Sequence, residues 1–475
     1  MLRLSLFLLL ISLIAGCSPA DDKNQQRSAN ANSKEIVFVT HNGPTTYYVN
    51  GDSQFAGIEY DLATLFVKDY MPGYQIKFLV VNSIGDVIPA LLKGKANIAA
   101  ANLSITHLRQ ELVQFSKPYQ ETQQQLILNN EVFENPKNLH TVKDLALLSD
   151  KSIAVPAGTS YAERLSQLQK EQPKLHWQAI ENTNSESLLE EVASGLLDFT
   201  VVDSHLLAVM KNYHPNLDVA MPIGKPEKIA WALSKNADPQ LISKVNAFFD
   251  KIHQDGTLRN LIDRYYGNVD RLNTQDITNF LKLSNTLLPK YMNIFKQAQE
   301  ITGIDWRLLA AISYRESHWD TFNTSPTNVR GLMMLTEKTA DLMGVTDRLD
   351  PKQSIPAGAK YLLKLKDTIP DRVPEPDRTY MALASYNIGY AHVEDARVLA
   401  QRLKLNPDSW VDVKKTLVML NNPEYYSTAK YGYASGGAPV IFVGSIRSYQ
   451  RILERYQPSH SPSYNNYKIA LADEY

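Results

Sequence analysis

The chain has 475 residues, of which 44% are hydrophobic and 21% charged, and its formal net charge is −1 at pH 7. This length is too great for one ordinary hydrophobic core and predicts two or three domains. The near-neutral charge gives no electrostatic footprint for nucleic acid, so we expect a partner that is recognised by shape and hydrogen bonding.

The N-terminus has the pattern of a targeting segment. Arg3 precedes an apolar run from Leu4 to Ile14, which is too short for a confident membrane span. The run ends in Ile14-Ala15-Gly16-Cys17, which resembles the lipobox of bacterial lipoproteins. That resemblance implies a signal peptide over residues 1–16, lipidation of Cys17 and, because Ser18 follows, sorting to the periplasmic face of the outer membrane. The alternative is an ordinary signal peptide with an incidental cysteine.

Cys17 is the only cysteine, so we expect mature domains without disulfides. Residues 17–34 are polar and predict a flexible tether that follows the lipidated residue, and residues 457–475 predict a similarly loose tail. The sequence contains neither a His-Glu-x-x-His string nor a cysteine cluster. We therefore expect no metal and no other cofactor.

Residues 35–269 alternate short apolar runs with amphipathic helical patterns. This alternation predicts α/β layers with largely parallel sheets. The expected strands are 36–39, 76–81, 98–101 and 153–155, and the expected helices are 60–70 and 84–92.

Ordered strings in this half resemble the family 3 extracellular solute-binding proteins. They are Gly57-Ile58-Glu59-Tyr60-Asp61-Leu62, Ala101-Asn102-Leu103-Ser104-Ile105-Thr106 with Arg109, Phe115-Ser116-Lys117-Pro118-Tyr119, Gly158-Thr159-Ser160, and Gly195-Leu196-Leu197-Asp198 before Val202-Asp203. The resemblance implies two α/β lobes that close on a small polar ligand. It also implies that Arg109 grips a ligand carboxylate and Asp203 a ligand ammonium, which suits a guanidinium fork and an acidic group. Interlobe or surface ion pairs are the alternative for both residues.

From about residue 270 to 456 the strand signals stop, and a second, all-α domain is expected. The expected helices are 277–283, 291–302, 306–317, 338–343, 356–369, 379–387, 392–404 and 411–420.

The helix predicted at 306–317 ends in a carboxylate. Leu309 and Ile312 share a helical face with Glu316, because they precede it by seven and four residues. If that face is buried, Glu316 lies toward the interior or a cleft floor, and its pKa rises. A general acid that works near neutral pH needs such surroundings. A solvated or ion-paired glutamate is the alternative.

Four strings in order resemble the soluble-lytic-transglycosylase catalytic domain, a lysozyme-like helical fold. They are Glu316-Ser317-His318-Trp319, Ser325-Pro326-Thr327-Asn328-Val329-Arg330-Gly331-Leu332-Met333-Met334-Leu335-Thr336, Ala384-Ser385-Tyr386-Asn387-Ile388-Gly389, and Tyr431-Gly432-Tyr433-Ala434 with Phe442-Val443 and Tyr449 beyond. The resemblance implies that Glu316 is the catalytic residue. It further implies a set of substrate-binding residues: Ser325, Gly331, Met333, Met334, Tyr386, Asn387 and Tyr431.

The residue types suit a sugar-binding cleft. Gly331 permits a close backbone approach, Tyr386 can stack on a sugar ring, and Asn387 offers a donor and an acceptor to an N-acetyl group. Core packing is the alternative for Met333 and Met334.

Three positions depart from the family pattern. Met334 stands where many members have glutamine, and Asn328 stands where glycine is common, although Asn tolerates a positive φ. Phe442 stands where a tyrosine is expected, so the phenol is assigned to Tyr431 or Tyr433.

The implied activity is non-hydrolytic cleavage of the MurNAc–GlcNAc bond of peptidoglycan glycan strands, with Glu316 as acid and then base and a 1,6-anhydro-MurNAc product. The first domain would sense or target muropeptides or amino acids, and the anchor would be a lipid or a peripheral contact at the outer membrane. The alternatives are a hydrolytic muramidase, and a periplasmic sensor whose helical part is only a wall-binding module.

Overall fold

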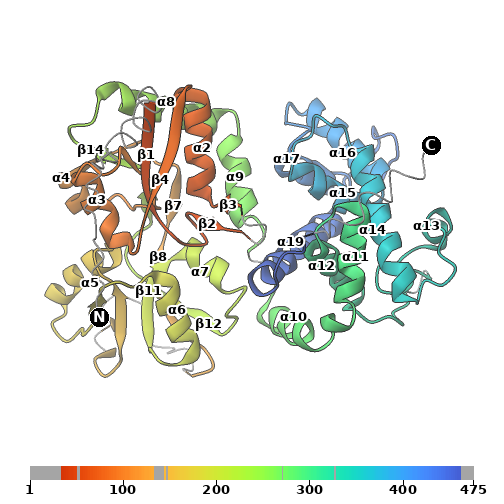
Figure 1. Ribbon diagram of the computed structural model, residues 1–475, viewed down its shortest axis with the longest axis horizontal. Helices are drawn as coiled ribbons and strands as arrows, with labels where there is room; N and C mark the ends of the chain where they lie inside the picture. The colour runs from red at the N-terminus through yellow and green to blue at the C-terminus, as the bar shows by residue number, and fades with distance from the viewer. Residues whose placement is uncertain are drawn as a thin grey trace, which may run out of the picture.

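The computed structural model of the chain describes residues 34–50, 54–132, 144–145, 148–269, 271–325 and 328–461. The predicted signal peptide, Cys17, the tether up to residue 33 and the tail from residue 462 lie outside the described residues. An α/β part and an all-helical part lie side by side (Figure 1). The predicted fold class, a two-lobed α/β part followed by a helical lysozyme-like part, is thereby confirmed.

Lobe one is built on a five-stranded sheet of order β4-β1-β5-β14-β6. Its strands are β1 (Lys34–His41), β4 (Tyr74–Val81), β5 (Ile98–Ala99), β14 (Ala232–Ser234) and β6 (Val113–Phe115). Side chains along β1 point alternately toward the two faces of this sheet, so the strand contributes to the packing on both. Phe38 packs toward α2 (Ile58–Tyr70), α8 (Pro239–Gln254) and α9 (Thr257–Tyr266), whereas Val39 packs toward α3 (Val87–Leu92).

Lobe two is built on a second five-stranded sheet, of order β10-β9-β11-β8-β12. Its elements are β8 (Gln124–Asn129), β9 (Ile153–Pro156), α5 (Ser160–Glu171), β10 (Gln178–Ile180), α6 (Ser185–Ser194), β11 (Phe199–Asp203), α7 (Ser204–Met210) and β12 (Leu217–Pro222). The pair β7 (Gln120–Thr122) and β13 (Glu227–Ile229) connects the lobes, since the chain enters lobe two through β7 and leaves it through β13. Both sheets contain antiparallel pairs that involve β14 or β8, so they are mixed rather than almost wholly parallel.

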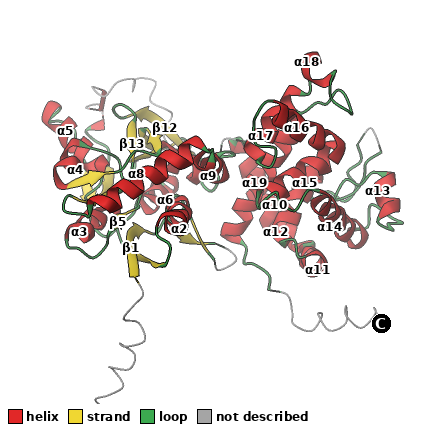
Figure 2. Ribbon diagram, turned by 90° about the horizontal axis from the view of Figure 1, so that it is seen from above, coloured by secondary structure: helices red, strands yellow, loops and turns green. Residues whose placement is uncertain are grey.

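The helical domain follows, and Figure 2 shows its helices packed around one another. It contains α10 (Thr274–Thr286), α11 (Met292–Thr302), α12 (Trp306–Ser317), α13 (Glu337–Leu342), α14 (Pro351–Thr368), α15 (Asp377–Ile388), α16 (Tyr390–Arg402), α17 (Trp410–Met419), α18 (Pro423–Tyr426) and α19 (Gly437–Tyr456). Helix α12 runs through its centre, and every residue from Trp306 to Tyr314 is buried. A helix that is buried on all sides is a core element, and the other helices are arranged around it.

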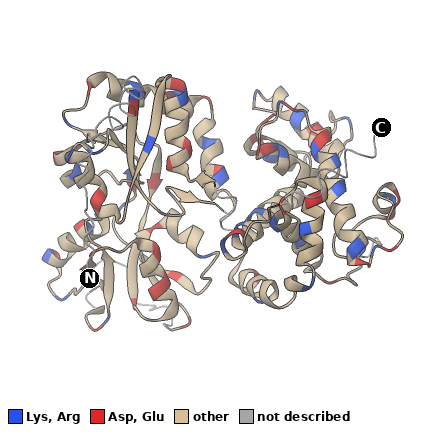
Figure 3. Cartoon of the chain, in the orientation of Figure 1, with Lys and Arg blue, Asp and Glu red and all other residues tan. Residues whose placement is uncertain are grey.

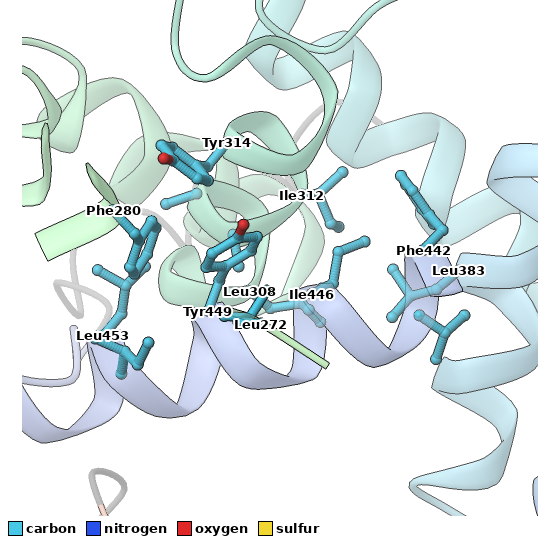
Figure 4. Packing of buried hydrophobic residues seen from close by; sticks show 14 of the residues in the cluster. Leu272, Phe280, Leu308, Ile312, Tyr314, Leu383, Phe442, Ile446, Tyr449 and Leu453 are labelled. Atoms are coloured by element: carbon cyan, nitrogen blue, oxygen red, sulfur yellow. The ribbon is translucent and has the colours of Figure 1, made fainter. Parts of the chain in front are cut away.

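Helix α19 is an element that the sequence prediction missed. Gly436, Gly437 and Pro439 at its start are typical of a loop. The structure gives Gly436 a packing role, because a Cβ there would collide with the carbonyl of Leu417 at the end of α17. Beyond this contact α19 runs along α12. Its Tyr449 packs against Phe280, with ring centroids 4.5 Å apart (Figure 4).

Both lobes contact the helical domain. On lobe one, Asp263 of α9 accepts from Lys414 of α17 and, at 3.2 Å, from Arg447 of α19. On lobe two, a hydrophobic cluster that includes Leu217 continues into the helical domain through Ile277. The α/β part is therefore held on lobe one by the contacts of Asp263, and on lobe two by apolar packing together with the ion pair of Arg455 and Glu190.

Acidic and basic side chains are interspersed over both domains in the part of the chain that the structure describes (Figure 3). This mixture agrees with the near-zero net charge. Among the described residues, no helix has the length and the apolar character that crossing a bilayer requires.

The contacts of Asp263 generate a stability prediction. Replacing it in Asp263→Asn leaves Lys414 and Arg447 without their buried carboxylate, which is expected to lower the free energy of unfolding by about 3 kcal/mol. Urea unfolding followed by tryptophan fluorescence measures the change. The control is Asp250→Asn, which removes a half-exposed ion pair with Lys117 and is expected to change stability by less than about 1 kcal/mol. Equal effects of the two substitutions would contradict the assignment.

Candidate functional site

Glu316 lies in the last turn of α12, where the helix leaves the core. The preceding residues on its face, Leu309 and Ile312, are wholly buried, whereas Glu316 itself is half-buried. The helix stops immediately after it, because His318 and Trp319 both adopt the left-handed conformation, with φ of 53° and 60°. Two consecutive non-glycine residues in the left-handed region of backbone conformation are uncommon. They cost free energy, which the packing around them must offset. The carboxyl group is thus held at a fixed helix end.

Burial raises the pKa of Glu316 from its ordinary value of 4.5 to about 7, and the neighbouring Arg315 opposes this rise. The carbonyl ends of the helix act in the same direction as burial, since the C-terminus of a helix disfavours an anion. Near neutral pH the group therefore exists in both forms. Such a group can give a proton and take it back.

The turn at 331–335 lies against the end of α12. The hydroxyls of Ser313 and Ser317 both donate to the carbonyl of Leu332, at 2.9 and 3.0 Å. The hydroxyl of Tyr386, on α15, donates to the next carbonyl, that of Met333, at 2.8 Å. These three bonds fix one backbone turn between α12 and α15.

Tyr386 also lies close to Glu316. Burial raises the pKa of the Tyr386 phenol well above its ordinary value, and the nearby Glu316 carboxylate raises it further. The phenol therefore stays protonated and keeps its bond to the backbone. The ring of Tyr361 packs on Tyr386, with ring centroids 5.4 Å apart.

Gly331 and the two methionines have distinct positions. Gly331 has φ of 80°, and a Cβ there would collide with the carbonyl of Arg348, so the close approach is to the protein's own backbone. Met333 is fully buried and packs against Gly358, which agrees with the core-packing alternative for its side chain. Met334 is half-buried with φ of 46°.

The loop before this turn is closed by Ser325. Its backbone N–H donates to the carbonyl of Val329 at 2.9 Å, and its hydroxyl accepts from the Val329 N–H at 3.1 Å. Asn328 has φ of 62°, as expected for a residue that replaces glycine. Residues 326 and 327 lie outside the described residues. Asn387, one residue beyond Tyr386, is exposed to solvent.

Tyr431 is 50% exposed and lies on the loop that follows α18. Both oxygens of the buried Asp395 hold this loop, because they accept from the backbone N–H groups of Lys430 and Tyr431 at 3.1 and 2.8 Å. Phe442, by contrast, is buried in the core, and the Arg315 guanidinium lies 5.8 Å from its ring centroid. Tyr431 and Tyr433 therefore offer exposed phenols in this region, whereas position 442 does not.

The first domain contains the other two residues that the sequence singled out. Arg109 is buried, and its Nε donates at 2.8 Å to Glu163 of α5, in the opposite lobe. Thr106 donates to the second oxygen of Glu163 at 2.7 Å, and Arg109 Nη2 donates to the carbonyl of Gly158 at 3.3 Å. The guanidinium that was expected to grip a ligand carboxylate is thus occupied by a carboxylate of this chain, as the ion-pair alternative foresaw.

Asp203 is buried at the end of β11. Burial raises its pKa to about 6, and the hydroxyls of Tyr161 and Thr122 and the charge of Arg109 oppose this rise. The Tyr161 hydroxyl donates to one carboxylate oxygen at 2.9 Å. Arg109 and Asp203 therefore lie in the same electrostatic environment, where the two lobes meet.

Several residues of these sites were missed in the sequence. Tyr361, Asp395 and Glu163 belong to none of the recognised strings, and no local pattern marks them. Each acts on a residue that lies 25 to 54 positions away in the chain, as the contacts of Tyr386, Lys430, Tyr431 and Arg109 show. Among the described residues, no group of three or more His, Cys, Asp or Glu side chains could hold a metal ion.

Comparison with known families accounts for both halves of the chain. Residues 36–268 match the bacterial extracellular solute-binding proteins, family 3. Residues 293–407 match the transglycosylase SLT domain. Among solved structures, a mutant ArgBP from T. maritima is 21% identical, covers 52% of this chain and 98% of its own, and superposes with a TM-score of 0.44.

Relatives match over both halves together. A protein from Methylobacillus flagellatus is 57% identical over 99% of this chain and 98% of its own length, and one from Nitrosospira multiformis is 45% identical over 90% and 87%. A third, from Pseudomonas putida, is 42% identical over 88% and 84%. Each of them is named membrane-bound lytic murein transglycosylase F. This chain belongs to that family of lytic murein transglycosylases.

Proposed function

We propose that the chain cleaves the β-1,4 bond between MurNAc and GlcNAc in peptidoglycan without consuming water, and that Glu316 is its acid and base. The observation that carries this proposal is the half-buried Glu316 carboxyl, whose burial raises its pKa to about 7 at a fixed helix end. Within a family of murein transglycosylases, that group has the protonation behaviour that the reaction needs.

The proposed reaction uses Glu316 twice. Its carboxyl proton passes to the glycosidic oxygen, the bond from that oxygen to the anomeric carbon of MurNAc breaks, and GlcNAc leaves. The acetamido oxygen of the substrate stabilises the positive charge at the anomeric carbon. The Glu316 carboxylate then accepts the proton of the MurNAc 6-hydroxyl, whose oxygen bonds to the anomeric carbon and closes the 1,6-anhydro ring. Glu316 ends the cycle protonated.

A single carboxylate suits this route. Most glycosidases need a second carboxylate as base or nucleophile. Asp320, Asp341 and Asp347, which follow Glu316 in the sequence, are exposed, and Asp305, which precedes it, pairs with Arg307. The charged residue that acts on the pKa of Glu316 is Arg315. These observations favour ring closure by the substrate's own hydroxyl over hydrolysis.

The substrate-binding residues have corresponding proposed roles. Tyr386 would line the cleft beside Glu316, because its hydroxyl is already bound to the Met333 carbonyl and its ring remains for stacking. Asn387 and Tyr431 are accessible to a glycan. Gly331, Met333 and Ser325 would act by shaping the turn and loop, and Met334 by lining them.

The first prediction from this mechanism concerns products. Glu316→Gln keeps the size of the side chain and removes the proton, so release of anhydro-muropeptides from purified sacculi is expected to fall at least about a thousandfold. Mass spectrometry of the soluble products measures it. The exposed Glu337→Gln is the control and should release wild-type amounts. Reducing-end MurNAc products from the wild type would instead indicate a muramidase, and undiminished release by Glu316→Gln would leave only a wall-binding role for the helical domain.

A second prediction concerns pH. Because the pKa of Glu316 rises on folding from 4.5 to about 7, the folded protein retains a proton that the unfolded chain has lost between those values. The free energy of unfolding of the wild type therefore falls progressively as the pH rises from 4.5 to about 7. Glu316→Gln has no such titration and is expected to be more stable than the wild type by about 1–3 kcal/mol near pH 8, with the advantage lost near pH 4. Urea unfolding at the two pH values measures this, and an advantage that is independent of pH would refute the assigned pKa.

We also propose that the first domain binds amino acids or muropeptide stems at Arg109 and Asp203. A ligand carboxylate can reach Arg109 only by displacing Glu163, because that carboxylate already occupies the guanidinium. The internal ion pair would thereby set the affinity. We further propose that a lipid on Cys17 anchors the chain at the periplasmic face of the outer membrane, and the relatives' names describe them as membrane-bound. In this proposal residues 35–269 are the ligand-binding unit and residues 270–456 are the catalytic unit.

The third prediction tests that competition. Glu163→Gln frees the Arg109 guanidinium, so the affinity for the tetrapeptide stem of muropeptides is expected to rise about tenfold. Isothermal titration calorimetry of the whole protein measures it. Glu171→Gln, at the exposed end of the same helix, should leave the affinity unchanged. Weaker binding by Glu163→Gln would mean that Glu163 belongs to the ligand site instead of competing for it.

A further inference from the structure

A cavity of about 450 Å³ lies where lobe one, lobe two and α19 meet. Lobe one contributes the segment after β1 together with Tyr265, lobe two contributes Glu186 and Tyr213, and α19 contributes Arg451, among others. Its size falls in the range of small-ligand sites. It shares none of its lining residues with the Arg109 and Asp203 site.

The two arginines that line this cavity, Arg451 and Arg455, already interact with other groups of the protein. Arg455 pairs with Glu190 at 2.8 Å, outside the cavity, and its guanidinium lies 4.7 Å from the ring centroid of Tyr213. Arg451 donates to two backbone carbonyls, those of Tyr265 at 3.0 Å and Arg264 at 3.2 Å. Among the described residues Arg451 forms no ion pair, although its charge acts on the nearby Glu454, so its guanidinium can still receive a carboxylate.

The negative side has two carboxylates, Glu186 and Glu454. In the part of the chain that the structure describes, neither Glu186 nor Glu454 forms an ion pair, and Glu454 accepts only a neutral donor, Gln450, at 2.9 Å. Burial raises the pKa of Glu186 to about 7 and also raises the pKa of Glu454. The charge of Arg455 opposes the rise in the pKa of Glu186, and the charges of Arg307 and Arg451 oppose the rise in the pKa of Glu454. Two partly buried carboxylates that form no ion pair would be stabilised by a ligand that brings positive charge.

We propose that this cavity binds a small molecule that carries both a primary ammonium and a carboxylate, either a free amino acid or a short peptide. The ammonium lies between Glu186 and Glu454, and the carboxylate faces Arg451. The rings of Tyr48, Tyr213 and Tyr265 provide apolar walls, and the hydroxyl of Tyr265 already donates to Asp61 at 2.8 Å. A ligand in this position contacts both lobes and α19 at once.

Calorimetry of the whole protein with glycine, L-lysine and L-alanyl-L-alanine tests the site. Binding of at least one probe is expected, and N-acetyl-L-alanine, which lacks the ammonium, should not bind. The tightest probe distinguishes a free amino acid from a peptide. No heat of binding from any of the three up to about 10 mM would overturn the proposal.

Three variants locate the binding. Glu186→Gln keeps the shape of the side chain but removes its charge, and it is expected to weaken the tightest probe about tenfold. Glu454→Gln should weaken it similarly, and this second variant covers a failure of the first to fold. Glu191→Gln, an exposed residue on the same helix as Glu186, should bind as the wild type does. Wild-type affinity in both Glu186→Gln and Glu454→Gln would overturn the proposal, because binding would then arise elsewhere, including at Asp203.

Hydrogen exchange gives a second readout that does not depend on a substitution. The bound probe is expected to slow exchange in peptides that cover 184–190 and 451–456. Slowing confined to peptides around 106–109 and 158–163 would place the ligand between the lobes and would also overturn the proposal. Neither measurement depends on the chemistry of Glu316, so its outcome is separate from that of the proposed reaction.

Discussion

The loss of water around the Glu316 carboxyl is the physical constraint on which the functional part of the structure depends. It requires a helix that is buried on every side up to its last turn, and α12 meets this requirement because α19 covers it. It also requires that the helix end where the carboxyl reaches the surface, and the left-handed His318 and Trp319 stop it there. The serines of α12 then bind the carbonyl of Leu332, so that the helix that bears the carboxyl also holds the 331–335 turn.

The sequence predicts this arrangement wherever the signal is local. The spacing of Leu309, Ile312 and Glu316 indicates a buried face that bears a carboxylate, and the structure has that face buried. The division into an α/β part and a helical part follows from a change in hydrophobic period, and the fold confirms it. Asn328 adopts the positive φ that its place in the glycine position of the family string suggests.

What the sequence does not reveal depends on contacts between distant segments. The pairing of Arg109 with Glu163 joins two lobes, and no pattern within either segment indicates it. Asp395 and Tyr361 hold site residues through tertiary contacts alone. The sequence does not indicate helix α19, because Gly436, Gly437 and Pro439 are typical of a loop. In the structure Gly436 allows its own backbone to approach that of Leu417 closely.

The α/β part contacts the helical domain through both ion pairs and apolar packing, which has a consequence for how the molecule responds to its surroundings. Ion pairs such as that of Arg259 with Asp412, at 2.7 Å, weaken as ionic strength rises, to an extent that burial limits. The apolar contacts around Leu217 and Ile277 weaken on cooling instead. Raising the ionic strength therefore weakens ion pairs on both lobes, including that of Arg455 with Glu190, whereas cooling weakens the apolar contacts of lobe two.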